Sequence, residues 1–384
     1  MTALRTGTTQ VSKSRVLLLG SYAPSLVNFR GPLIAEMVRR GHHVIAAAPE
    51  IDVAISAQLQ ALGAESVSTP LARTGMNPLH DLAYLGELAG VVRRLRPDML
   101  IAYTAKPVIW GSLAARRVGT PKVAAMITGL GYAFTDGGEA RRRVAKAAAS
   151  FLYRGALKRC DHILFQNPDD RDLFQKLGLI GDPSRASLVN GSGVDVGHYL
   201  PAPLRPGPRF LMIARLLVSK GVREYARAAT ELKRRYPAAS FQLAGWVDPS
   251  PDGIPQAELD GWVGQGLEYL GQLDDVRPAL AASAVYVLPS YREGTPRSVL
   301  EAMAIGRPVI TTDAPGCRET VVQGVNGLLV PPRDAEALKA AMERFILHPE
   351  QIAPMGEQSL RMVAEKYDVH RVNDQILAAV GLGR

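Results

Sequence analysis

Two glutamates, Glu293 and Glu301, bracket the stretch of this chain whose residue types could do chemistry. The apolar run 284–288 before them predicts a buried strand, and Pro296 is placed to start a helix that Gly306 ends. Helix N-termini attract anions through unpaired N–H groups and the helix dipole. Because eight residues of helix span about 12 Å, the two carboxylates cannot act on one atom. They could hold the two ends of one long ligand, and a nucleotide-sugar offers ribose, diphosphate and sugar in that order.

Two cations, Arg215 and Lys220, directly follow the strand that we expect at 210–214. The carboxyl ends of parallel strands are where open sheets bind ligands, and a diphosphate needs fixed positive charge. Gly245 and Leu273 follow the next two expected strands and could flank a nucleobase.

Each of these charges has a simpler interpretation. The two cations could be solvated side chains on a loop. Glu293 could be a favourable charge near a helix start, and Glu301 a solvated helix residue.

Three loops in the first half of the chain also follow expected strands. The first, 20–30, has no Gly-x-Gly-x-x-Gly fingerprint, which disfavours a dinucleotide-binding dehydrogenase. Because strand ends share one edge of a parallel sheet, these loops should face one cleft; ordinary turn chemistry is the alternative. The candidate residues on them are Asn28, Arg30, Lys106, Thr128, Gly129 and Gly131.

A metal site is not expected. Asp170 and Asp172 have Asp-x-Asp spacing, but they fall in the first turn of an expected helix, where acids stabilise the dipole. Residues two apart on a helix point away from each other. The seven histidines lack His-x-x-x-His spacing, and Cys160 and Cys317 form neither a metal pattern nor a disulfide framework. A reducing cytoplasm fits this cysteine usage best.

The charge balance indicates an anionic partner. The net charge is +9 and aromatic residues make up 6% of the chain, without a nucleic-acid motif. A membrane surface or a phosphate ligand is therefore the better explanation than nucleic acid. The basic residues 141–159 predict a helix with an apolar stripe, which could rest on an anionic membrane or pack on its own sheet. No apolar run is long enough for a transmembrane helix, and residues 1–14 read as a disordered tail rather than a secretory signal.

The order of expected elements gives the fold class. Strands alternate with helices from residue 15 onward, which predicts a doubly wound parallel sheet. The Pro-rich segment 201–208 interrupts the pattern, which then restarts, and we expect this segment to be a linker. The 384 residues are enough for two domains. We therefore expect an α/β protein with two Rossmann-like, doubly wound domains facing a cleft.

Three motifs resemble those of bacterial retaining glycosyltransferases of family four, which have the GT-B fold. Residues 293–301 match the family's Glu-x7-Glu element, and 215–221 match its Arg-x4-Lys-Gly element. The surrounding 289–294 and 300–309 match its framework. Four segments of the first half look like the subgroup that acts on undecaprenyl-diphosphate-linked sugars, such as N-acetylgalactosaminyltransferases: Asn28–Arg30, Lys106–Pro107, Thr128–Gly131 and Phe165–Asp170.

The resemblance implies a disordered tail and two domains, one that binds the acceptor and one that binds the donor. Residues 1–14 would be disordered, 15–200 would bind the acceptor, 201–366 would bind the nucleotide-sugar, and 367–384 would form a helix that returns to the first domain. The acceptor side would include Asn28, Arg30, Lys106, Thr128, Gly129 and Gly131.

The resemblance also implies residue roles on the donor side. Arg215 and Lys220 would bind the donor diphosphate and stabilise it as leaving group, as catalytic residues together with Glu293. Glu301 would hold the ribose hydroxyls, and Glu293 would contact the transferred sugar. The remaining donor-side residues would be Gly245, Leu273, Gly294, Thr295 and Pro296. Two departures from the family stand out: Thr295 replaces a common Phe, and Lys106 and Thr128 stand where many relatives have His or Glu.

The activity implied is metal-independent, retaining transfer of a hexose or N-acetylhexosamine from a UDP-sugar to a lipid-linked saccharide in polysaccharide or glycan biosynthesis. The enzyme would be cytoplasmic and peripheral on the inner face of the plasma membrane, with residues 141–159 as a membrane contact. Three alternatives stay open: a nucleotide-sugar epimerase or hydrolase of the same fold, a non-catalytic nucleotide-sugar-binding protein, and a basic nucleic-acid binder.

Overall fold

The chain forms two compact units in a computed structural model that describes residues 13–70, 78–130 and 140–383. Unit 1 comprises Met1–Phe165, Leu173–Val189 and Asn373–Arg384. Unit 2 comprises Gln166–Asp172 and Asn190–Val372. Almost all of the predicted disordered tail, and Gly131 of the predicted site, lie outside the described residues.

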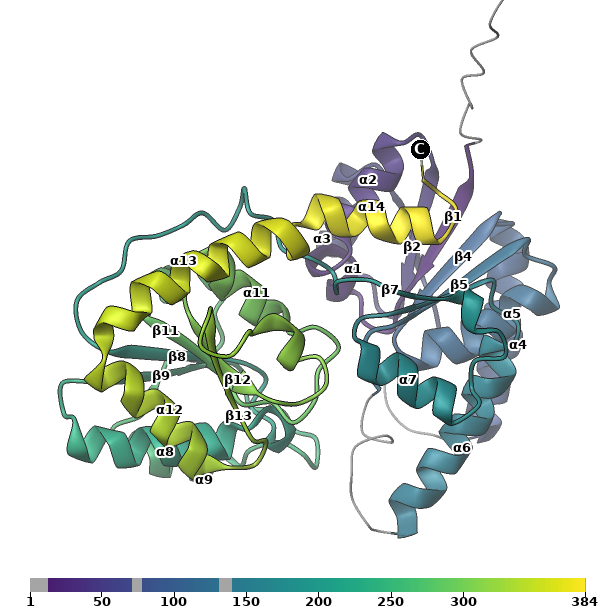
Figure 1. The fold of residues 1–384 in the computed structure, drawn as a ribbon. Helices are drawn as coiled ribbons and strands as arrows, with labels where there is room; N and C mark the ends of the chain where they lie inside the picture. Colours follow the sequence, from purple (N-terminus) through teal and green to yellow (C-terminus); the bar gives the residue numbers. More distant parts are fainter. Residues whose placement is uncertain (1–12, 71–77, 131–139, 384) are drawn as a thin grey trace, which may run out of the picture. The chain divides into compact units, whose positions relative to one another are not determined.

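Unit 1 is built on a parallel sheet (Figure 1). The strand order is β3-β2-β1-β4-β5-β6-β7, so the order reverses between β1 and β4. The central strands are continuous apolar runs, because helices cover both faces of such a sheet and bury the side chains on each side. The strands are β1 Arg15–Leu19, β2 His43–Ala48, β3 Glu65–Ser68, β4 Met99–Tyr103, β5 Lys122–Ile127, β6 His162–Phe165 and β7 Ala186–Leu188.

The helices of unit 1 connect these strands in the order of a doubly wound fold. Two short helices follow β1: the first ends at Asn28, and Pro32 lies in the first turn of the second. The helices are α1 Pro24–Asn28, α2 Gly31–Arg39, α3 Val53–Ala61, α4 Pro78–Leu95, η1 Pro107–Gly111, α5 Ser112–Arg117, α6 Ala140–Leu157, η3 Pro183–Arg185 and parts of α7 Pro168–Lys176 and α14 Val369–Ala379.

Unit 2 repeats the architecture with a second parallel sheet. The strand order is β10-β9-β8-β11-β12-β13, with the reversal between β8 and β11. Ligands bind at such reversals, beyond the carboxyl ends of the strands. The strands are β8 Arg209–Ile213, β9 Ser240–Ala244, β10 Glu268–Tyr269, β11 Val285–Leu288, β12 Val309–Thr312 and β13 Gly327–Val330.

Helices of unit 2 pack on both faces of its sheet, and α8 and α12 lie side by side (Figure 1). The helices α9 and α10 were not expected from the sequence. The elements are η4 Val218–Lys220, α8 Val222–Arg235, α9 Gln256–Val263, α10 Arg277–Ala282, α11 Arg297–Ala304, η5 Arg318–Thr320, α12 Ala335–Leu347, η6 Pro349–Gln351, α13 Ile352–Met362 and η7 Val363–Tyr367.

The expectation of two Rossmann-like parallel-sheet domains is confirmed, but the Pro-rich segment 201–208 lies within unit 2 rather than between the units. The buried guanidinium of Arg307 donates hydrogen bonds to the carbonyl oxygens of Ala202 at 2.8 Å and Pro203 at 3.3 Å. These bonds fasten the start of the segment to unit 2. The last residues of the chain, Asn373–Arg384, belong to unit 1.

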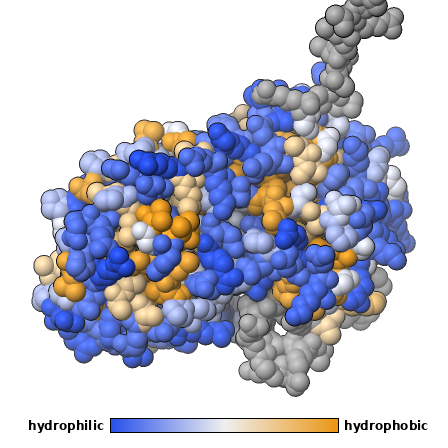
Figure 2. Space-filling model, viewed as in Figure 1, coloured by the Kyte–Doolittle hydropathy of each residue, from blue (hydrophilic) through white to orange (hydrophobic). Residues whose placement is uncertain are grey.

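The surface shown in Figure 2 is mostly hydrophilic, with apolar patches between the polar residues. Each unit has its own buried hydrophobic cluster. Within the described ranges, no helix is both long and apolar enough to cross a membrane.

Candidate active site

Glu293 and Lys220 form an ion pair at the strand reversal of unit 2. Glu293 lies in the loop after β11, and Lys220 ends η4 in the loop after β8. The buried hydroxyl of Ser290 donates a second hydrogen bond to Glu293 Oε1, at 2.6 Å. Only 14% of the Glu293 side chain is exposed. Glu293 is thus held by defined partners and is more than a charge near a helix start.

The backbone of the two loops fixes this pair. Gly221, directly after Lys220, has φ +73°, and a Cβ there would overlap the carbonyl group of Pro289. Glycine is therefore required for this close approach. The amide of Tyr291 donates to the carbonyl oxygen of Ser219 at 2.9 Å, which joins the two loops directly.

Arg215 stands at the same strand end as Lys220 but has a different partner. Its Nη1 lies 3.4 Å from Asp248 Oδ2, and its side chain is 41% exposed. Hydrogen bonds from Ser250 and then the charge of Arg215 lower the pKa of Asp248. Sequence reasoning missed Asp248. The long distance and the exposure leave the guanidinium of Arg215 accessible to a ligand.

Glu301 is buried in α11 with two hydrogen-bond donors. Tyr199 OH and Arg297 Nε each lie 2.9 Å from the same oxygen, Oε1. Burial raises the pKa of Glu301, and the positive charge of Arg297 opposes that rise. Glu301 is therefore not the solvated helix residue of the simpler interpretation. Tyr199 and Arg297 carried no sequence signal, because nothing local distinguishes them from ordinary surface residues.

The segment between the two glutamates caps α11 and contacts the start of α7. Pro296 is the N-cap of α11. The carbonyl oxygen of Gly294 accepts a 3.0 Å hydrogen bond from Asn167 Nδ2. The hydroxyl of Thr295 donates to the carbonyl oxygen of Gln166 at 3.2 Å.

Gly245 and Leu273 lie at the other side of the same sheet, after β9 and β10. Gly245 has φ +146°, and a Cβ there would overlap the carbonyl oxygen of Ala214. The amide of Gly245 donates to the carbonyl oxygen of Gly271 at 2.8 Å, and Leu273 is half-buried in the loop that follows. The strand ends that carry the predicted donor-side residues therefore share one edge of unit 2.

The described candidates of unit 1 also gather at one edge of its sheet, because β1, β4 and β5 are neighbours. Asn28 is exposed at the end of α1, and Lys106, Thr128 and Gly129 are half-buried beyond β4 and β5. Arg30 differs, since it is 3% exposed with its guanidinium 5.0 Å from the ring centroid of Tyr103. Arg30 thus packs into unit 1 instead of facing outward.

Thr104 is a feature of this edge that the sequence did not reveal. It has φ +67°, which is strained for a β-branched residue. Its hydroxyl lies 2.8 Å from that of Ser21, which follows β1. The two strand ends at the reversal are thus joined by a hydroxyl pair.

The acidic residues in the first turn of α7 form ion pairs with arginines of unit 2. The sequence had suggested only an interaction with the helix dipole. Asp169 contacts Arg318 Nη1 through both carboxylate oxygens, at 3.1 Å each. Asp170 is buried and forms an ion pair with Arg292. The exposed Asp172 instead forms an ion pair with its neighbour Arg171.

The basic helix α6 is described in part, since the side chains of 141–146 lie outside the described residues. Tyr153 is buried and packs edge-to-face on Phe174, with ring centroids 5.1 Å apart. Phe151 is 74% exposed. The helix therefore packs against α7 through Tyr153 and also presents the aromatic side chain of Phe151 to solvent.

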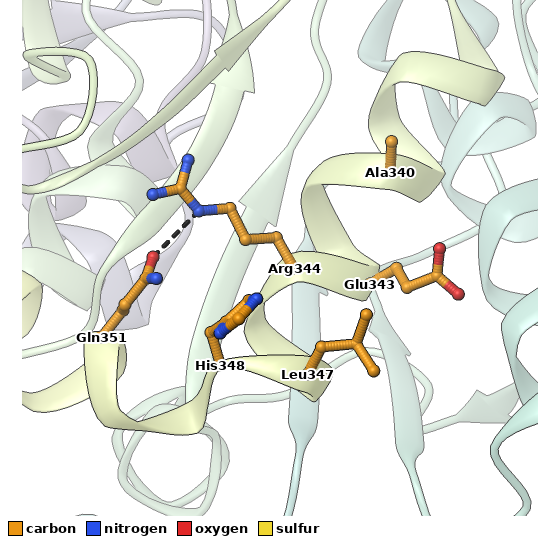
Figure 3. A pocket seen from close by; sticks show the side chains of 6 residues that line it. All are labelled: Ala340, Glu343, Arg344, Leu347, His348 and Gln351. Atoms are coloured by element: carbon orange, nitrogen blue, oxygen red, sulfur yellow. Dashed lines mark hydrogen bonds between the residues drawn. The ribbon is translucent and has the colours of Figure 1, made fainter.

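An open hollow on α12 and η6 lies on different elements from the candidate site (Figure 3). One of its lining residues is Arg344, whose Nε donates to Gln351 Oε1 at 2.9 Å. The lining residues are Ala340, Glu343, Arg344, Leu347, His348 and Gln351. None of them is a predicted site residue.

Comparisons with known proteins match both halves of the chain. Residues 29–191 match the family model described as "Glycosyl transferase 4-like domain", and residues 207–348 match "Glycosyl transferases group 1". The chain is 27% identical to the N,N'-diacetylbacillosaminyl-diphospho-undecaprenol alpha-1,3-N-acetylgalactosaminyltransferase of Campylobacter jejuni, over 94% of this chain and 97% of that protein.

Two further proteins agree with these matches. The chain is 26% identical to the UDP-Gal:alpha-D-GlcNAc-diphosphoundecaprenol alpha-1,3-galactosyltransferase of Escherichia coli, over 69% of this chain and 70% of that protein. The crystal structure of Anabaena Alr3699/HepE in complex with UDP has a TM-score of 0.76 at 17% identity, over 96% of this chain and 99% of that one. This last likeness concerns the fold. The two matched domains, the motifs around Lys220 and Glu293 and the paired parallel sheets show that the chain belongs to the GT-B glycosyltransferases of family four.

Proposed function

We propose that this glycosyltransferase moves a hexose or N-acetylhexosamine from a UDP-sugar to an undecaprenyl-diphosphate-linked saccharide. The acceptor class is supported by the relatives from Campylobacter jejuni and Escherichia coli, whose names specify undecaprenyl-diphosphate-linked substrates. The uridine nucleotide is supported by the UDP-Gal donor in the second name. The observation that carries the proposal is the ion pair of Lys220 with Glu293 at the strand reversal of unit 2.

The two cations of the site supply the charge that departure of UDP requires. The ammonium of Lys220 has three donors, so it can contact a phosphate while one donor stays on Glu293. Arg215 is accessible and can bind the second phosphate through its planar fork. Fixed cations stabilise the negative charge that develops on the diphosphate in the transition state. With this charge in place, the proposed reaction needs no metal ion.

The carboxylates would serve the two ends of the donor. Tyr199 and Arg297 both donate to Oε1 of Glu301, and Oε2 would accept from the ribose hydroxyls. Glu293 would lie against the transferred sugar, where its negative charge stabilises an oxocarbenium-like transition state. We propose front-face attack by the acceptor hydroxyl on the anomeric carbon, with retention of configuration: the new C–O bond forms as the bond to UDP breaks, and the hydroxyl proton passes to the departing diphosphate.

The acceptor is assigned to unit 1. The candidates at its sheet edge are Asn28, Lys106, Thr128 and Gly129, to which the hydroxyl pair of Ser21 and Thr104 is added. A lipid-linked acceptor places the reaction at a membrane surface. We propose that α6 contacts anionic lipid on the cytoplasmic side through its basic residues and Phe151.

The test is a product analysis with labelled UDP-N-acetylgalactosamine and UDP-galactose, with and without an undecaprenyl-diphosphate-linked saccharide. Transfer that depends on the acceptor is expected. Release of sugar to water alone would instead favour the hydrolase, and a changed nucleotide-sugar without transfer would favour the epimerase. Binding without turnover of any nucleotide-sugar would favour the non-catalytic binding protein.

A further inference from the structure

The start of α7 makes a dense set of contacts with the loop that carries Glu293. Asn167 Nδ2 donates to the carbonyl oxygens of Glu293 at 3.2 Å and Gly294 at 3.0 Å. Asp170 pairs with Arg292, the residue directly before Glu293. Although these segments are far apart in the sequence, both belong to unit 2. Main-chain and side-chain contacts thus hold residues on both sides of Glu293.

Asp170 depends on this pairing. Its side chain is fully buried, and its Oδ2 has no hydrogen-bond partner within the described part of the chain. Burial raises the pKa of Asp170, and the charge of Arg292 opposes that rise. A buried carboxylate is costly unless it is paired and hydrogen-bonded. The buried carboxylate of Asp170 therefore fixes the position of Arg292, because any movement of the guanidinium would leave this carboxylate unpaired.

Asn167 connects the helix and the loop in a single side chain. Its Oδ1 accepts from the amide of Asp170 at 2.8 Å, which is an N-cap bond of α7, while its Nδ2 serves the loop. The orientation that caps the helix is thus the one that directs the amide group toward the Glu293 backbone.

We propose that Asn167 and Asp170 are positioning residues that hold the loop of Glu293 in the geometry needed for sugar transfer. This inference rests on the proposed function, because it assigns them to the same reaction. They act through Arg292 and the backbone of Glu293 and Gly294, and contact no part of the donor themselves. Preorganised charge in an active site accelerates reaction only when its position is fixed.

The experiment compares Asp170→Asn and Asn167→Ser with the control Asp172→Asn in the full chain. Asp172 lies on the same helix, and 61% of its side chain is exposed. Serine at 167 keeps an N-cap acceptor but removes the amide donor. Two readouts are taken: hydrogen exchange of the backbone amides of 291–295, and kcat and KM for the donor in acceptor-dependent transfer.

The expected result is faster exchange in 291–295 and a kcat lowered about tenfold or more in both variants, with donor KM changed by less than about twofold. Asp172→Asn should match the wild type. Exchange and kcat at wild-type values in Asp170→Asn and Asn167→Ser would overturn the inference. If Asp170→Asn does not fold, the test is the comparison of Asn167→Ser with Asp172→Asn and the wild type. If the wild type transfers no sugar, the proposed function fails, and unchanged exchange still decides against positioning.

Discussion

Lys220 is the side chain on which donor binding should depend most. Its Nζ pairs with Glu293, and its side chain is 22% exposed. Replacing it by alanine removes a charged donor to the diphosphate, which costs about 1.5–3 kcal/mol, or roughly 10- to 150-fold in UDP affinity. Isothermal titration with UDP measures this loss. The matched control is Lys339→Ala, since Lys339 pairs with Glu231 and is 29% exposed; equal affinities in the two variants would contradict the assignment.

Tyr199 should contribute through Glu301 alone. Its hydroxyl donates to Oε1 at 2.9 Å, so Tyr199→Phe leaves the carboxylate with Arg297 as its remaining donor. Loss of a hydrogen bond to a charged group should weaken UDP binding by about 1–2 kcal/mol, or roughly 5- to 30-fold. The control is Tyr236→Phe, which removes a 2.8 Å bond from a tyrosine to Glu343. A similar loss of affinity in both variants would argue against a ribose-binding role.

The protonation of Glu301 gives the site a pH dependence. Burial raises its pKa above the ordinary 4.5, so it takes up a proton at a higher pH than an exposed glutamate does. The folded chain then binds more protons than the unfolded chain, and this group's contribution to stability falls as pH rises through the raised pKa. Ribose hydroxyls need the ionised form as acceptor.

Affinity for a UDP-sugar should therefore fall as pH decreases, beginning above pH 4.5. The measurement is the Kd of a UDP-sugar between about pH 5 and pH 8, a range in which its diphosphate has no proton to lose. Glu301→Gln should bind more weakly at neutral pH and should lack this fall. A parallel pH profile in wild type and variant would show that another group is responsible.

At the scale of elements, the backbone of Gly316 lies close against the backbone of the loop that carries Glu293. Gly316 has φ +79°, and a Cβ there would overlap the carbonyl groups of Glu293 and Gly294. Gly324 has a similar φ of +76°, but a Cβ added there would meet no atom within 4 Å. Both alanine variants should lose about 1–2 kcal/mol of stability from backbone strain, and Gly316→Ala should lose more because its Cβ must displace the two carbonyl groups. Only Gly316→Ala should also lower kcat, because it alone displaces the loop; equal kcat values would contradict this.

The elements that sequence reasoning located well are those with strong local patterns. The apolar run before Glu293 is β11, and Gly306 ends α11 with φ +87°. The edge strands β3 and β13 were not expected; β3 is polar and lacks an apolar run. Motif spacing brought Lys220 and Glu293 to one site. The segment Phe165–Asp170 was singled out by resemblance, but the roles of Asn167 and Tyr199 were not, because these roles depend on contacts across more than 100 positions of the chain.

At the scale of the whole molecule, the chain crosses between its two units around α7, after β7 and within α14. The sequence predicted two domains but placed their boundary at the Pro-rich segment, because proline content does not reveal that Arg307 binds that segment's carbonyl groups. The first turn of α7 belongs to unit 2, and the end of α14 belongs to unit 1. Such assignments depend on tertiary contacts that local pattern does not encode.

The end of α14 should stabilise unit 1 without affecting donor binding in unit 2. Ile376 is fully buried, and Arg40 contacts the same segment through Asp374 and the carbonyl oxygen of Leu382. Ile376→Ala should cost about 2–5 kcal/mol of stability through the cavity it leaves. Thermal denaturation reports that loss, while the Kd for UDP should stay within about twofold of the wild type, because unit 2 holds the donor-side residues. A large loss of UDP affinity would show that the units are coupled.

The most direct test of the central claim is acceptor-dependent transfer by wild type and Glu293→Gln, measured in the presence of a chelator. Glutamine keeps the size of Glu293 but removes the charge that faces Lys220. We predict that the wild type, without a divalent metal, links the sugar to the lipid-linked saccharide with retention of its anomeric configuration. Glu293→Gln should be slower by about 100-fold or more while it still binds UDP. Equal rates in the two proteins, or sugar released only to water, would contradict the account.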